Sequence, residues 1–197
     1  MTRRLPSTAH VDEFVRTART EGLHAAVSKA SQVLRARWYL RDTDAGTVRV
    51  RGRVKVQNHG SIRLGNKLRL DGTLVPIELV SFGGAVVIGD GTYINYGTSI
   101  SSTCSVSIGK NCLIGQYAIV MDDDYHAVGD HSKPGRQAPV VIEDDVWIGA
   151  RVVVLRGSHI GRGAVIGANS VVKGRIPPFT VAAGMPARVI REIPHRD

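Results

Sequence analysis

Three consecutive carboxylates lie close before a histidine in the middle of this chain: Asp122, Asp123 and Asp124 are followed by Tyr125 and His126. A neutral imidazole can take a proton from a hydroxyl group near neutral pH, and a nearby carboxylate can fix its tautomer and stabilise its cation. His126 is therefore a candidate general base, and one of the three carboxylates is expected to orient it, with Asp124 as the catalytic candidate among them. An ordinary exposed loop histidine is the alternative that the residues alone leave open.

A six-residue repeat predicts the elements that hold this segment. Consecutive units begin with an aliphatic residue and carry Val, Ser or Ala at the fifth place; they start at Ile142, Ile148, Val154, Ile160 and Ile166. Two inward positions per unit are typical of a parallel β-helix. A period of six does not keep the aliphatic residues on one side of an α-helix, and the strict phase argues against an antiparallel sandwich.

The same rule extends upstream through units that start at Ile88, Ile94, Ile100, Ile108 and Ile114. Glycine often stands second in a unit, which suits sharp corners because glycine tolerates positive φ. We predict an all-β solenoid of three-sided coils, repeated about five times. Cys104 and Cys112 occupy the small fifth place of their units, so both are predicted to fill the core.

A long stretch interrupts the repeat after Val120. Val120 starts an eleventh unit, but its fifth residue is Asp124, and the next unit arrives only at Ile142. We therefore expect an external loop over residues 121–141. Functional residues concentrate in loops that a rigid scaffold holds in place, and His126 lies in this one.

Composition predicts a single domain with three parts. We expect a helical and basic segment at 1–47, the β-helix at 48–177 and a C-terminal segment at 178–197. No stretch of 18 or more apolar residues and no apolar run typical of a signal peptide occurs, so we expect a cytoplasmic protein. The net charge of +9 suits nucleic acid, an anionic membrane or a phosphorylated ligand, but no nucleic-acid motif is present and aromatic residues are only 5%, so no nucleic acid partner is expected.

Apolar residues between Val11 and Trp38 recur at intervals of three and four, which predicts an amphipathic helix or a pair of helices broken near Gly22. One interpretation is an N-terminal cap that covers the open strand edges of the first coil. The alternative is weak association with an anionic membrane surface through Arg16, Arg19, Arg35 and Arg37.

Several stretches resemble one family: Val-Trp-Ile-Gly at 146–149, Ile-Gly-Ala-Asn-Ser-Val-Val at 166–172, Ile-Pro-Pro at 176–178, and the segment 181–190. From about Val86 to Ile193 the chain resembles the hexapeptide-repeat acyltransferases, in the galactoside, maltose and polysaccharide O-acetyltransferase branch. The resemblance implies a left-handed β-helix and a homotrimer with active sites between neighbouring prisms. It also implies acetyl-CoA as co-substrate and no required metal.

In enzymes of this type a loop histidine takes the proton from an acceptor hydroxyl as it attacks the thioester, and His126 matches that position. Asn95 resembles the family asparagine that lies across the subunit boundary near the reacting carbonyl, although a plain corner role is equally open. The candidate residues for binding the acceptor are Tyr96, Asp122, Asp123 and Tyr125.

The resemblance also implies a groove between two prisms for the acyl donor, with the pantetheine arm against the backbone of Gly149, Ala150 and Ala168. Trp147 either flanks this groove or packs at the trimer contact. Lys173 and Arg188 are candidates for the nucleotide phosphates. Arg175 is a further candidate, because the family's usual Thr-Lys-Asp before Ile-Pro-Pro reads Lys-Gly-Arg at 173–175 here.

The basic helical start is similar to the polysaccharide branch and unlike the enzymes that act on free galactosides or maltose. We therefore expect a carbohydrate acceptor, namely a sugar hydroxyl of a glycan, a polysaccharide precursor or a glycoconjugate. Acetyl is the default acyl group, and succinyl is the alternative.

Two other functions compete with this prediction. One is a zinc-dependent hydratase similar to the β-helical carbonic anhydrases, with His126, His131 and His159 as ligands, although their spacing matches that family poorly. The other is a non-catalytic β-helix scaffold, against which the acidic cluster before His126 argues.

Overall fold

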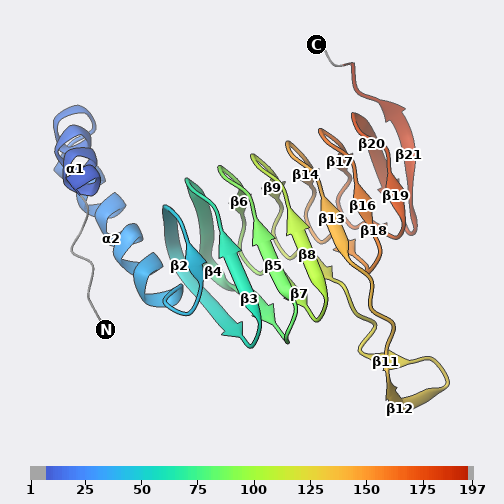
Figure 1. Ribbon diagram of the computed structural model, residues 1–197. Coiled ribbons are helices and arrows are strands. Elements are labelled where there is room, and N and C mark those ends of the chain that lie inside the picture. Colours follow the sequence, from blue (N-terminus) through green and yellow to red (C-terminus); the bar gives the residue numbers. More distant parts are fainter. Residues whose placement is uncertain (1–7, 195–197) are drawn as a thin grey trace.

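The computed structural model describes residues 8–194, in which two helices precede a stack of short strands (Figure 1). The helices are α1 (Thr8–Thr20) and α2 (Leu23–Tyr39). No helix in this part of the chain has the length and apolar character needed to cross a membrane.

The strands form the three faces of a left-handed parallel β-helix, as the six-residue repeat and the resemblance predicted. The first face consists of β1 (Asp44–Ala45), β3 (Ser61–Leu64), β5 (Ala85–Ile88), β8 (Ser105–Ile108), β13 (Val140–Ile142), β16 (His159–Ile160) and β19 (Arg175–Ile176).

The second and third faces share two long strands that bend from one face to the next, β2 (Val48–Asn58) and β4 (Leu68–Ser81). The second face continues with β6 (Tyr93–Ile94), β9 (Leu113–Ile114), β14 (Trp147–Ile148), β17 (Val165–Ile166) and β20 (Thr180–Gly184), to which β21 (Ala187–Glu192) pairs antiparallel. The third face continues with β7 (Ser99–Ser102), β10 (Ile119–Met121), β15 (Val153–Val154) and β18 (Val171–Val172).

The aliphatic residues that start the units stack inside the prism in register. Ile94 pairs with Ile114, Ile114 with Ile148, and Ile148 with Ile166, and each is at most 1% exposed. Because apolar burial stabilises by roughly 25 cal/mol per Å², these ladders are the main cohesive element of the fold. The inward assignment of these first positions is confirmed.

The first face carries seven strands, so the prism has more coils than the five that the sequence predicted. The additional coils lie before residue 88, where β2 and β4 run through a corner without a break. The pairing of β2 with β4 shifts there from Gly52–Gly72 to Val54–Ile77. The extra residues in β4 interrupt the six-residue period.

The prediction of two core cysteines is right for Cys112, which is fully buried, and wrong for Cys104, which is exposed. The cause is a two-residue slip at the corner between β7 and β8. Ser102 points inward there, and the inward positions resume at Val106 and Ile108. Cys104 consequently faces outward.

The helices lie at the end of the prism formed by the first coil, with α2 next to β2 (Figure 1). Ala36 of α2 and Leu40 are buried in the same core cluster as Val48 and Val50 of β2. An ion pair between Glu13 and Arg49 ties α1 to the same coil. The predicted N-terminal helical cap is therefore present.

Candidate functional site

The chain leaves the prism after β10 and returns at β13, and the intervening loop extends away from the coils (Figure 1). Its tip is a hairpin of β11 (His126–Ala127) and β12 (Asp130–Pro134). The two legs of the loop pair through Asp124 N to Arg136 O at 3.1 Å and through Ala138 N to Asp122 O at 3.0 Å. This is the predicted protruding loop, held as an ordered hairpin.

Asp122 anchors the base of the loop to the prism. Its carboxylate is 1% exposed and accepts hydrogen bonds from Ser102 Oγ at 2.7 Å, Thr103 N at 2.8 Å, Thr103 Oγ1 at 3.1 Å and Cys104 N at 2.9 Å. Hydrogen bonds to an ionised carboxylate are strong when they are buried. The carboxylate of Asp122 is thus fully engaged by its own chain.

Asp123 and Tyr125 also have structural partners. Asp123 accepts hydrogen bonds from Tyr125 N at 2.7 Å and from Gln137 Nε2 at 3.2 Å. The Tyr125 hydroxyl lies 2.7 Å from Ser101 Oγ, and its ring meets Phe82 edge-on with centroids 6.3 Å apart. These contacts fix the chain immediately before His126.

His126 is exposed, and its Nδ1 lies 3.1 Å from the backbone oxygen of His131. A carbonyl oxygen can only accept a hydrogen bond, so the proton of the neutral imidazole is on Nδ1. Nε2 then carries the lone pair, which is the arrangement that a general base needs.

Asp124 does not orient this imidazole. Its Oδ2 accepts a charge-assisted hydrogen bond from Arg156 Nε at 2.5 Å. Both residues line a hollow of about 290 Å³ together with His126, Arg136 and the chain at 127–128. The structure therefore differs from the sequence hypothesis: a backbone carbonyl takes the place of the carboxylate.

Sequence reasoning missed Arg156 and Arg136 as members of this hollow. Arg156 follows β15, 32 residues after Asp124, and neither cation belongs to a motif. Only the folded coils bring Arg156 beside the loop.

Asn95 lies at the corner between the second and third faces, which we name the Asn95 corner (residues 95–97, 115–117, 149–151 and 167–169). Its Oδ1 accepts a hydrogen bond from Tyr96 N at 2.9 Å, and its Nδ2 lies 3.5 Å from Gln116 Oε1. The Nδ2 contact is at the long limit for a hydrogen bond, so this amide group can still donate to a ligand.

Aromatic and cationic groups surround this corner. Tyr96 meets Tyr117 edge-on with centroids 5.5 Å apart, and Arg151 lies over the Tyr117 ring at 5.8 Å. On the adjoining second face, Trp147 is 54% exposed.

The predicted donor-binding residues Gly149, Ala150 and Ala168 stack at the same corner. Asn169 N donates to Ala150 O at 2.9 Å, and a Cβ atom on Gly149 would come within 2.7 Å of Ala168 N. Glycine is therefore required at position 149 for stacking of the coils.

The three candidate cations for the nucleotide phosphates are exposed but separated. Arg188 of β21 pairs with Ala183, close to the C-terminal end of the Asn95 corner. Lys173 lies at the corner from which the loop protrudes, and Arg175 lies on the first face. Of these three cations, only Arg188 lies close to Ala150 and Ala168 of the same chain.

His126 and Asn95 are brought to different corners. The Asn95 corner precedes β7, whereas Ser102 at the other end of β7 bonds to Asp122 at the base of the loop. A four-residue strand is roughly 10 Å long, and the hairpin extends outward from its far end (Figure 1). The two candidate catalytic side chains thus lie at opposite edges of the third face.

Known proteins share both the repeat and much of the remaining chain. The model for "Bacterial transferase hexapeptide (six repeats)" matches residues 139–174, and that for "Hexapeptide repeat of succinyl-transferase" matches residues 105–120. A putative lipopolysaccharide biosynthesis O-acetyl transferase of Escherichia coli is 37% identical over 153 residues, which cover 71% of this chain and 76% of the relative. The galactoside O-acetyltransferase of the same species is 40% identical over 124 residues, covering 62% and 61%.

The chain belongs to the hexapeptide-repeat acetyltransferases, in the galactoside O-acetyltransferase branch.

Solved structures agree with this assignment. The structural alignment with a hexapeptide-repeat acetyltransferase from Vibrio cholerae covers 96% of each chain, with a TM-score of 0.61 and 26% sequence identity. A galactoside acetyltransferase in complex with coenzyme A covers 64% of both chains with a TM-score of 0.55 and 32% identity. The present acetyltransferase is accordingly an acetyl-CoA-dependent acyltransferase.

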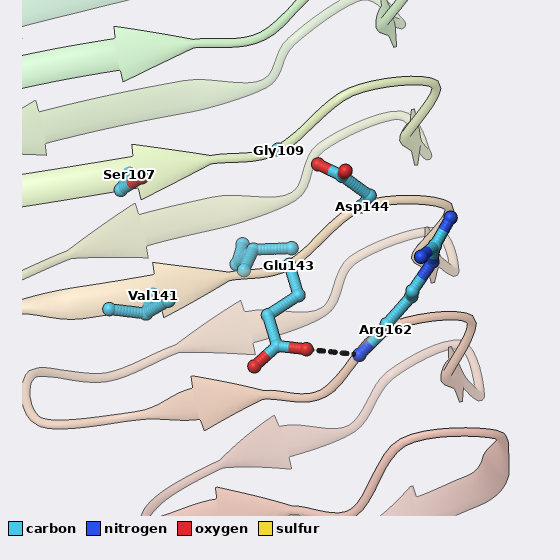
Figure 2. A pocket seen from close by; sticks show the side chains of 7 residues that line it. Ser107, Gly109, Val141, Glu143, Asp144 and Arg162 are labelled. Atoms are coloured by element: carbon cyan, nitrogen blue, oxygen red, sulfur yellow. Dashed lines mark hydrogen bonds between the residues drawn. The ribbon is translucent and has the colours of Figure 1, made fainter.

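A second hollow of the acetyltransferase, of about 300 Å³, lies at the corner between the first and second faces (Figure 2). Glu143 accepts a hydrogen bond from Arg162 N at 2.8 Å and lies 2.6 Å from His159 Nε2. The hydrogen bonds from His159 and Arg162 lower the pKa of the Glu143 carboxyl. His159 is therefore engaged by a carboxylate on the first face.

The zinc hypothesis required the side chains of His126, His131 and His159 to lie close enough together to bind one metal ion. The rings of His126 and His131 are 6.4 Å apart. Residues 8–194 contain no group of three or more His, Cys, Asp or Glu side chains that could hold a metal ion. The three histidines thus do not form the predicted ligand set in this acetyltransferase.

Proposed function

We propose that this acetyltransferase moves an acetyl group from acetyl-CoA to a sugar hydroxyl of a glycan, a polysaccharide precursor or a glycoconjugate, with His126 as the general base. The observation that carries the proposal is the bond between Nδ1 of His126 and the His131 carbonyl, which leaves Nε2 free to accept a proton. The names of the two similar O-acetyltransferases of Escherichia coli support a sugar hydroxyl as the acceptor.

In this proposal Nε2 of His126 takes the hydroxyl proton while the hydroxyl oxygen attacks the thioester carbonyl. The imidazolium then returns the proton to the departing thiolate, so the base is regenerated. General-base catalysis of this kind contributes about 10² to 10⁴ in rate. The Asn95 amide group is the proposed donor to the developing oxyanion, a role that preorganised donors fill in acyl transfer.

We infer that the active site forms between two chains of a homotrimer. His126 and Asn95 occupy opposite edges of the third face, so a neighbouring prism is the natural source of the second residue. The same arrangement accounts for the separated cations: Arg188 would act with Ala150 and Ala168 of its own chain, and Lys173 or Arg175 would come from the neighbour.

The geometry favours Tyr96 over the acidic residues for contact with the acceptor. Tyr96 lies beside Asn95, and its aromatic neighbour Tyr117 is 39% exposed, so this corner offers flat apolar surface for a sugar ring. Asp122 and Asp123 are buried in bonds to their own chain, and Tyr125 is held by Ser101. We therefore assign these three residues to positioning of the loop.

The direct test measures thiol release from acetyl-CoA in the presence of galactosides, maltose, oligosaccharide fragments and lipid-linked glycans. We expect at least one carbohydrate to stimulate release, and His126→Ala to lower kcat by about 10² to 10⁴. His59→Ala, a change of another exposed histidine on an earlier coil, is the matched control. Stimulation by none of the carbohydrates, or unchanged turnover in His126→Ala, would refute the proposal.

A mixing experiment tests the shared site. His126→Ala and Asn95→Ala chains are each expected to be inactive alone. When the two are unfolded and refolded together, random assembly pairs an intact His126 with an intact Asn95 at about one quarter of heterologous interfaces. Activity near that fraction supports a site between chains, whereas activity that stays at the level of the single variants contradicts it.

A further inference from the structure

An apolar stripe runs along the solvent side of α2. Leu23, Val27, Leu34 and Trp38 are 66%, 54%, 64% and 68% exposed. At 3.6 residues per turn these four positions fall within an arc of about 60°. The buried positions Ala26 and Ala36 lie on a different side of the helix, so the stripe is not the side that packs on the first coil.

Exposure of such an apolar stripe to water is unfavourable in free energy. The exposed part of each side chain orders water without any packing in return, and contiguous apolar patches usually mark a binding surface. Tryptophan adds a preference for a boundary between apolar and aqueous phases, because its ring is apolar and its N–H is polar.

Positive charge accompanies the stripe. Arg35 and Arg37 are exposed on the same helix, and the Arg41 guanidinium lies 5.3 Å from the centre of the Trp38 ring. Arg16 and Arg19 are exposed on α1.

Arg41 pairs with Asp42, whose Oδ2 lies 3.5 Å from its Nε, while two other acidic residues of the helical segment pair with cations outside this set. Glu21 pairs with Lys29, and Glu13 pairs with Arg49 of the prism. Among the residues that the structure describes, Arg16, Arg19, Arg35 and Arg37 form no ion pair. An apolar stripe bordered by free cations is complementary to a surface that offers acyl chains beneath anionic headgroups.

We propose that α2, assisted by α1, lies in the interface of an anionic membrane, with Leu23, Val27, Leu34 and Trp38 inserted among the acyl chains. The arginines meet the lipid phosphates. Because both helices lie at one end of the prism (Figure 1), the β-helix stands on the membrane with its first coil nearest to the lipid.

The inference rests on the proposed function, because a membrane-bound enzyme would encounter lipid-linked glycan acceptors. Membrane binding itself is measured without catalysis. The purified full-length chain is sedimented with vesicles of phosphatidylcholine alone or of phosphatidylcholine with phosphatidylglycerol. We expect binding to the anionic vesicles, much weaker binding to the neutral ones, and weakening by salt, since the Debye length falls from about 10 Å at 0.1 M to about 3 Å at 1 M.

Two pairs of substitutions separate the contributions of the apolar side chains and of the arginines to vesicle binding. Leu23→Ser with Leu34→Ser is expected to lower the partition coefficient for anionic vesicles at least tenfold, or about 1.4 kcal/mol. Arg35→Gln with Arg37→Gln is expected to lower it severalfold and to reduce its salt dependence. The matched control is Val189→Ser with Ile190→Ser, which removes exposed apolar side chains from β21 and should leave binding unchanged.

The alternative occupant of the stripe is a second copy of the chain. Light scattering measures this directly: dissociation of the oligomer by Leu23→Ser with Leu34→Ser, without vesicle binding by the unmodified chain, would overturn the membrane proposal. Vesicle binding by the double variant equal to that of the unmodified chain would overturn it as well. Thiol release with a water-soluble acceptor is expected to stay unchanged in the double variant, so failure of membrane binding and failure of the proposed reaction are distinguishable.

Discussion

The imidazole of His126 is held by the backbone carbonyl of His131, five residues further along the loop, with 3.1 Å between Nδ1 and the oxygen. The loop thus supplies its own orienting group across the hairpin of β11 and β12. Since the carbonyl carries no net charge, it fixes the tautomer without adding the electrostatic stabilisation of the imidazolium that a carboxylate would provide.

The first prediction separates the His131 backbone from its side chain. His131→Ala keeps the carbonyl, so we expect kcat within about threefold of the unmodified enzyme, whereas His126→Ala should lose the full contribution of a general base. Steady-state kinetics of both variants check this. A loss in His131→Ala as large as that in His126→Ala would mean that the second imidazole takes part in proton transfer.

The second prediction concerns the ion pair of Asp124 and Arg156, whose Oδ2 and Nε are 2.5 Å apart. If this pair positions the loop, Asp124→Ala and Arg156→Ala should lower kcat/KM to a similar extent, and the double variant should lose little more than either single variant. A double-mutant cycle in kcat/KM measures this coupling. A large loss in Asp124→Ala beside a silent Arg156→Ala would instead indicate that the carboxylate acts on His126.

The sequence predicted the prism, its protruding loop and the position of His126, because a six-residue period reports directly which side chains point inward. It did not predict the partners of the loop. The link between Asp124 and Arg156 joins residues 32 positions apart, and the support of His126 comes from a backbone atom that has no side-chain signature. Likewise, the backbone N–H of Cys104 bonds to the buried carboxylate of Asp122, 18 positions further along the chain.

The third prediction assigns Asp122 a structural role. Asp122→Ala would leave the hydroxyl of Ser102 and the backbone N–H groups of Thr103 and Cys104 without their acceptor, and unsatisfied buried donors cost about 1–3 kcal/mol each. We expect a clear fall in thermal stability, because about 1 kcal/mol shifts the midpoint by about 2–4 °C in a chain of this size.

Thermal unfolding followed by circular dichroism checks the role of Asp122. Asp130→Ala is the matched control, since that carboxylate is exposed at the loop tip and bonds to its near neighbours Ser132 and Lys133. A stable Asp122→Ala protein with a raised KM for the acceptor would contradict the structural role and restore Asp122 as a binding residue.

The fourth prediction follows from the different positions of the two cysteines. Burial raises the pKa of the Cys112 thiol to about 11, and the thiol donates to the Glu143 carbonyl at 3.1 Å. Alkylation requires the thiolate, so at pH 8 Cys112 is protected both by its protonation and by the surrounding coils. Cys104 is exposed, so the coils do not cover its thiol. Mass spectrometry after treatment with iodoacetamide should therefore find one adduct per native chain, two after unfolding in denaturant, and none in the native Cys104→Ser variant. Labelling of Cys112 in that native variant would show that the coil around β9 opens under native conditions, which is incompatible with the continuous ladder from Ile94 to Ile166.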